Sequence, residues 1–187
     1  MSERREAIVK AAFQVFSRYG LKRATMNDIA EEAGVTRQTL YNVFANKDEL
    51  LRATIRLHAD RSIAAIEARC AGLCDLGDKL DVVFDRLVVV PWVLVHATPH
   101  GDEILSGVRD VARQEVALAD SRYAAMLETM LAPYAENLST AGMTVSQLCD
   151  LTQRSWYGIR HKARDRDHLD TLLKSLKALV LNAARSC

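Results

Sequence analysis

Apolar residues recur at helical spacing along nearly the whole chain, and residues 1–50 divide into short helical blocks. Ile8, Val15 and Phe16 fall on one side of a helix predicted over residues 3–19. Gly20 ends this helix, because glycine readily adopts the left-handed conformation found at helix C-termini. The chain is therefore expected to begin with an amphipathic helix.

Two shorter helices follow, joined by a tight turn. Thr25 and Asp28 have the spacing of a capping box, in which each residue's side chain satisfies a backbone N–H of the other. Gly34 closes this helix, and Thr36 is suited to cap the next one, predicted over residues 37–44. Two short helices with such a turn between them indicate a helix-turn-helix, whose second helix enters the major groove of DNA.

Asn46 and Glu49 then begin a fourth helix. Over about residues 5–52 the sequence resembles the TetR family of transcriptional regulators. The residues that carry this resemblance are Phe13, Phe16, Gly20, Thr25, Met26, Ile29, Ala30, Ala33, Gly34, Val35, Thr36, Thr39, Leu40, Tyr41, Phe44, Asn46, Lys47, Leu50 and Leu51. Gln38 and Asn42 depart from the residues common in the family, so the operator sequence cannot be taken from a relative.

A helix in the major groove reads base edges near its N-terminal end and is held in place by contacts with phosphates. Arg37 can pair with guanine, and Gln38 or Asn42 with adenine, while hydroxyl groups and Lys47 suit phosphate oxygens. The two threonine caps would be needed in any case, and Tyr41 could simply pack. The predicted DNA contacts are Thr25, Thr36, Arg37, Gln38, Thr39, Tyr41, Asn42 and Lys47.

One long helix is predicted over residues 47–72, and it would connect the DNA-reading part to the rest of the chain. We place the domain boundary near residue 52. This gives a helix-turn-helix DNA-binding domain of residues 1–52 and a helical effector-binding and dimerisation domain of residues 53–187.

Residues 80–96 are apolar on nearly every side, which is typical of a helix at the centre of a domain. Pro91 interrupts this helix, because it cannot donate a hydrogen bond to the Leu87 carbonyl. A second apolar stripe with methionines follows over residues 116–130. Each of these residues could be ordinary core, but the resemblance implies an effector pocket among these helices. The predicted pocket residues are Phe84, Val88, Trp92, His96, Tyr123, Met126 and Trp156.

The last two predicted helices carry apolar stripes, and the final stripe is wide for the end of a chain. Such a stripe is typical of a surface covered by a partner, although packing against the chain's own core would explain it equally well. The resemblance implies that the two helices pair with their copies in a four-helix bundle. The predicted dimer residues are Leu148, Thr152, Ser155, Ile159, Leu169, Leu172, Leu173, Leu176, Leu179 and Val180.

Composition limits the classes of function. The chain is 49% apolar and 26% charged with a net charge of +1, as in an ordinary globular protein without a general affinity for DNA. DNA binding must therefore come from local charge and from two copies acting on a roughly palindromic site. No signal-peptide core is present, and the longest apolar run, residues 87–95, is too short to span a bilayer. A cytoplasmic protein that does not enter the membrane is expected.

The sequence thus predicts an all-α protein of about nine helices. Its expected function is that of a homodimeric DNA-binding repressor, released from double-stranded operator DNA by a small, largely apolar effector. No cofactor and no metal are expected, since the cysteines at positions 70, 74, 149 and 187 are scattered and lack zinc spacing.

Two alternatives stay open. The C-terminal domain could bind only another protein, or no ligand at all, because periodicity does not separate pocket residues from core. The chain could also be an enzyme, with Cys70 or Cys149 as nucleophile and a histidine as base. No recognisable catalytic motif supports that second interpretation.

Overall fold

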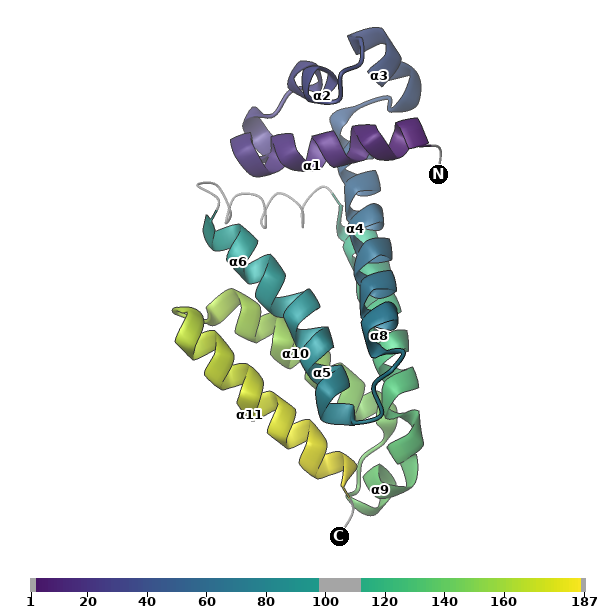
Figure 1. The fold of residues 1–187 in the computed structure, drawn as a ribbon, viewed down its shortest axis with the longest axis vertical. Helices are drawn as coiled ribbons and strands as arrows, with labels where there is room; N and C mark the ends of the chain where they lie inside the picture. Colours follow the sequence, from purple (N-terminus) through teal and green to yellow (C-terminus); the bar gives the residue numbers. More distant parts are fainter. Residues whose placement is uncertain (1–2, 98–111, 186–187) are drawn as a thin grey trace. The chain divides into compact units, whose positions relative to one another are not determined.

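The computed structural model describes residues 3–97 and 112–185, and all the regular secondary structure of these residues is helical (Figure 1). The all-α class predicted from the sequence is confirmed. Within the described ranges, no helix is both long enough and apolar enough to cross a membrane.

The described residues pack into two compact units. The first contains residues 3–61, 94–97 and 112–119, and the second contains residues 62–93 and 120–185. The domain boundary expected near residue 52 stays a prediction.

The first unit begins with three helices and the start of a long fourth one (Figure 1). Their bounds are α1 (Glu3–Arg23), α2 (Met26–Glu32), α3 (Arg37–Val43) and α4 (Lys47–Cys70). Gly20 interrupts α1 with a φ of 76°, a left-handed conformation that glycine adopts without strain. The predicted end of the first helix is therefore a kink, after which one further helical turn leads to α2.

The predicted helix starts are present with their predicted chemistry. Thr25 and Asp28 form a complete capping box at α2. The Thr36 side chain accepts a hydrogen bond from the backbone N–H of Thr39 at α3. At α4 the Asn46 side chain accepts one from the backbone N–H of Glu49, at 2.8 Å.

The first unit has its own apolar core. Ile8, Ile29, Leu40, Phe44 and Leu50 come from all four helices or the loops between them, and each is fully buried. Because α2 and α3 have seven residues each, they are too short to be stable alone and depend on this core.

The second unit contains the end of α4 and the helices that follow. These are α5 (Leu76–Phe84), a π-helix (Asp85–Val89), α6 (Val90–Ala97), α8 (Arg113–Leu131), a 3-10 helix (Ala132–Tyr134), α9 (Ala135–Thr140), α10 (Val145–Lys162) and α11 (Arg166–Ala184). The outer ends of α6 and α8 belong to the first unit. In the second unit α10 and α11 form an antiparallel pair, and α11 also packs against α5 (Figure 1).

The core helix of the second unit, formed by α5, the π-helix and α6, is interrupted near Pro91, as the sequence predicts. The expectation that residues 80–96 are buried on nearly every side is wrong for the last part, because Val90, Val93 and Leu94 are exposed. The interruption takes the form of a π-helical turn over residues 85–89, which ends two residues before the proline. Val90 donates its backbone N–H to the Asp85 carbonyl, five residues back instead of four. The chain thus inserts one residue into the helix and continues as α6.

Candidate nucleic-acid interface

Helix α3 presents a polar, exposed face. Its Leu40 is fully buried, whereas Arg37, Gln38, Tyr41 and Asn42 are exposed. The structure therefore places four of the five predicted DNA-contacting residues of α3 on one accessible surface, and the fifth, Thr39, is half-buried. Tyr41 lies on this surface and is not packed into the core.

These exposed side chains form two pairs, and the two residues of each pair are about one helical turn apart. Gln38 donates from Nε2 to Oδ1 of Asn42 at 3.1 Å. The Arg37 guanidinium carbon lies 5.5 Å from the centre of the Tyr41 ring, within the range of a cation–π contact. Pairing restricts the rotamers of all four groups before any ligand binds. The sequence contains the spacing of both pairs, but we did not predict them.

The predicted threonine contacts are engaged at the helix starts. Thr36 donates from Oγ1 to Oγ1 of Thr39 at 2.9 Å. Thr25 donates from Oγ1 to Oδ2 of Asp28 at 2.8 Å. Hydrogen bonds from the Thr25 side chain and backbone lower the pKa of the Asp28 carboxyl. The hydroxyl hydrogens of Thr25 and Thr36 are already donated within the chain, so a phosphate would have to replace these hydrogen bonds, whereas Thr39 only accepts here and keeps its hydroxyl hydrogen for a phosphate.

Lys47 is half-buried and joins the start of α4 to the end of α1. Its Nζ donates to the carbonyls of Leu21 at 2.7 Å and Ala24 at 3.0 Å. Two of the three N–H bonds of the ammonium group are thereby occupied, and one stays available for a phosphate. The structure shows Lys47 first as a residue that fixes the loop before α2.

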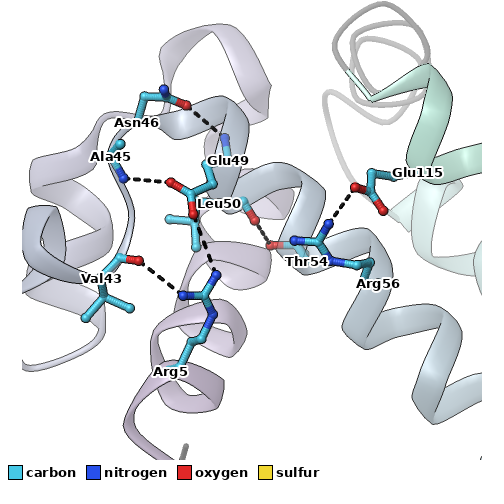
Figure 2. Close-up of polar contacts among 9 residues, drawn as sticks. All are labelled: Arg5, Val43, Ala45, Asn46, Glu49, Leu50, Thr54, Arg56 and Glu115. Carbon is cyan, nitrogen blue, oxygen red and sulfur yellow. Dashed lines mark hydrogen bonds and ion pairs between the residues drawn. The ribbon is translucent and has the colours of Figure 1, made fainter. Parts of the chain in front are cut away.

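Arg5 of α1 braces the C-terminal end of α3 (Figure 2). Its Nη1 donates to the Val43 carbonyl at 3.3 Å, and its Nη2 lies 3.6 Å from Oε1 of Glu49. The guanidinium carbon also lies 4.2 Å from the centre of the Phe44 ring. Glu49 in turn accepts a hydrogen bond from the backbone N–H of Ala45 at 2.8 Å. This network holds the chain where α3 ends, and no local pattern around Arg5 indicates it.

Six of the seven predicted pocket residues share one core in the second unit. Phe84, Val88, Trp92 and Trp156 are buried there, and Tyr123 and Met126 pack against them. The Phe84 and Trp156 rings meet edge to face, with their centres 6.3 Å apart. His96, by contrast, is exposed on α6 and belongs to the first unit.

The predicted dimer residues divide into two sets. Six of them are buried within the chain itself: Leu148, Thr152, Leu169, Leu173, Leu176 and Val180. The other four are half-buried or exposed and line a shallow groove of about 500 Å³ between α10 and α11: Ser155, Ile159, Leu172 and Leu179. Leu176, although only 7% exposed, also lines this groove, as does Gly158.

Cys70 and Cys149, the two cysteines considered as nucleophiles, do not have the environment of activated thiols. Burial raises the pKa of the Cys149 thiol to about 11, and burial also raises the pKa of Cys70. An activated thiol has the opposite shift, toward the thiolate. Cys187 lies outside the described residues, and the described residues contain no cluster of three His, Cys, Asp or Glu side chains able to hold a metal ion.

The N-terminal part of the chain matches a known family. Residues 8–65 match the family described as bacterial regulatory proteins, tetR family. The HTH-type transcriptional regulator YvdT of Bacillus subtilis is 31% identical over 85 residues, which cover 46% of this chain and 44% of YvdT. The HTH-type transcriptional regulator TtgR of Pseudomonas putida is 47% identical over 53 residues, which cover 28% of this chain and 25% of TtgR. The matches thus span less than half the length of these curated relatives.

Solved structures match the fold over nearly the whole chain. A TetR-family transcriptional regulator from Rhodococcus has a TM-score of 0.72 at 18% identity, covering 99% of this chain and 100% of the other. The fatty acid degradation regulator FadR from Bacillus halodurans has a TM-score of 0.69 at 19% identity, covering 96% and 99%. At this identity the likeness concerns the fold alone.

The brace on α3 is testable by substitution of Arg5. Arg5→Met keeps an apolar stem over Phe44 but removes the donors to Val43 and Glu49. We expect amide hydrogen exchange over residues 40–44 to become roughly tenfold faster, as for the loss of a contact of about 1.4 kcal/mol. Arg4→Met, at the neighbouring exposed arginine, is the control and should leave these rates unchanged. Equal rates in the two variants would remove Arg5 as the brace.

Proposed function

The chain belongs to the TetR family of bacterial regulatory proteins, and on this basis we propose that it is a transcriptional regulator that binds double-stranded DNA. The observation that carries the proposal is the exposed face of α3, where two pairs of side chains are held on a short, braced helix. Chromosomal DNA as the target would place the protein in the cytoplasm.

The side chains of α3 suit particular bases. Asn42 keeps both Nδ2 hydrogens and one lone pair of Oδ1 after its bond with Gln38, which is enough for a bidentate contact with adenine. Arg37 has five N–H donors and can pair with the O6 and N7 atoms of guanine. The threonine hydroxyls and the remaining N–H of Lys47 are proposed to contact phosphates.

Substitution of Arg37 tests base reading. Arg37→Ala should weaken binding by ~1–3 kcal/mol and relax the preference at one base pair, because a guanine contact is lost. The measurement is fluorescence anisotropy with DNA from beside the protein's own gene, at fixed salt, followed by selection of preferred sites. Arg166→Ala, at an exposed arginine of α11, is the control. If Arg37→Ala weakened binding to all sequences alike, Arg37 would be a phosphate contact and not a base reader.

We propose further that two copies of the chain associate as a dimer through the groove between α10 and α11. Leu179 is 67% exposed in this groove, and Ile159 and Leu172 give it further apolar surface. A β-carbon added at Gly158 would meet no atom within 4 Å, so this wall of the groove is open to close approach by another helix. The near-neutral net charge of +1 also favours a dimer, since one copy lacks strong electrostatic attraction to DNA.

A charge placed in the groove tests this dimer. Leu179→Glu should raise the dimer dissociation constant at least about tenfold, because a carboxylate would have to be desolvated at the interface. Sedimentation velocity over a range of concentrations measures the change. Leu118→Glu substitutes a leucine of α8 that is 60% exposed, outside the groove, and serves as the control. A dimer unaffected by Leu179→Glu would place the interface elsewhere.

The core of the second unit is the proposed site of a small, largely apolar effector. Its aromatic and methionine side chains suit an apolar ligand, and the half-buried Tyr123 hydroxyl, whose pKa is raised by burial, could orient a polar group. Binding would favour a dimer whose two α3 helices do not match successive major grooves, about 34–36 Å apart. The proposed regulator is thus a repressor that acts on a roughly palindromic operator and is released by its effector.

A thermal-shift screen of small apolar molecules tests the effector. A ligand at a hundred times its dissociation constant should stabilise the folded protein by about 2.7 kcal/mol. The same ligand should lower operator affinity roughly 5–150-fold in the anisotropy measurement. A ligand that stabilises the protein but strengthens DNA binding would make it a co-repressor. A screen without any stabilising ligand would favour a second unit that binds only a protein, or nothing.

A further inference from the structure

The core helix of the second unit has a carbonyl that its own helix cannot satisfy in the α-helical pattern. In that pattern the N–H of residue 91 would donate to the Leu87 carbonyl, but Pro91 has no N–H. The surroundings are apolar, since Leu87 is 4% exposed and Val88 is fully buried. A buried carbonyl left without a donor is costly, so a donor from another element would stabilise it.

Arg160 of α10 supplies that donor. Its Nη1 lies 3.0 Å from the Leu87 carbonyl oxygen, across 73 residues of sequence. Its guanidinium carbon lies 5.3 Å from the centre of the ring of Tyr157, which precedes Arg160 by about one turn of α10. A hydrogen bond from a charged donor is stronger than the neutral backbone bond it replaces.

The positive charge of Arg160 also acts on α8. Burial raises the pKa of the Asp120 carboxyl, and the positive charge of Arg160 opposes this rise. Gln153 of α10 donates from Nε2 to the Asp120 backbone carbonyl at 2.7 Å, which holds α8 beside α10 at this level. Arg160 therefore stands where the core helix, α8 and α10 meet within the second unit.

We propose that Arg160 is a positioning residue that replaces the N–H missing at Pro91 and thereby couples the winding of the core helix to the position of α10. Its neighbours Ile159 and Lys162 line the groove proposed as the dimer interface. A ligand that changes the π-helical turn at residues 85–89 would alter the Arg160 contact and, with it, the outer surface of α10. The link to dimer geometry rests on the proposed function; the coupling between Arg160 and Pro91 does not.

A double-mutant cycle tests the coupling in the full chain. Arg160→Met removes the donors and keeps most of the length of the side chain, whereas Pro91→Ala restores the backbone N–H that the α-helical pattern directs to the Leu87 carbonyl. We expect Arg160→Met to raise the unfolded-to-folded ratio roughly tenfold when residue 91 is proline, and less than about threefold when it is alanine. Urea unfolding measures all four proteins without DNA or effector.

Two comparisons separate coupling from a general packing role. Arg154→Met removes an exposed arginine of α10 that pairs with Asp150, and it should act equally in both backgrounds. Arg160→Lys keeps a donor and should recover part of the loss with Pro91 present. If Arg160→Met unfolded the protein only when residue 91 is proline, the coupling would be supported.

Equal destabilisation by Arg160→Met in both backgrounds, or loss of folding in both, would overturn the proposal. That result would leave the DNA-binding, dimer and effector proposals untouched, because their tests do not involve Arg160 or Pro91. If the cycle showed the expected coupling but the protein failed to bind DNA, the proposed function would be rejected and the coupling would stand.

Discussion

The burial of Leu40 and Phe44 is the contact on which the DNA-binding surface depends. Helix α3 has only seven residues, and a helix of that length is not stable in water alone. Leu40 on its inner face and Phe44 at its end are both fully buried in the first core. With these two side chains fixed, the opposite face of α3 points outward, and its exposed residues can pair with one another.

Polar contacts fix the ends and loops of the helices that the apolar core packs together. Arg5 engages the last carbonyl of α3 and stacks on Phe44, and Lys47 fixes the loop that leads into α2. Arg5 and Lys47 each donate hydrogen bonds to backbone carbonyls, so each fixes the backbone as well as adding positive charge. This division suits a protein of near-neutral charge, in which affinity for a polyanion must come from well-placed groups and from a second copy.

The second unit shows a related use of a cation. Pro91 lacks the N–H that would donate to the carbonyl of the buried Leu87 in an α-helix, and Arg160 from another helix donates to that carbonyl instead. A contact of this kind ties two elements together more specifically than apolar packing, because it has one donor, one acceptor and a direction. Arg160 also belongs to α10, whose outer residues line the groove between α10 and α11.

The sequence by itself determined the helical class, the helix starts of the first unit and the interruption near Pro91. These features are local: a capping residue and its partner lie within three or four positions, and a missing N–H is a property of one residue. Helical periodicity also identified most of the two cores. It could not separate Leu169 and Leu173, which are buried within the chain, from Leu172 and Leu179, which lie in the groove.

Only the tertiary structure decided the contacts between distant segments. Arg5 and Val43 are 38 residues apart, Lys47 and Leu21 are 26 apart, and Arg160 and Leu87 are 73 apart. A charged side chain on a helix has the same local pattern whether it is solvated or bound to a distant carbonyl. The difference arises when folding brings a carbonyl within reach and excludes water from it, and no periodicity in the sequence records that event.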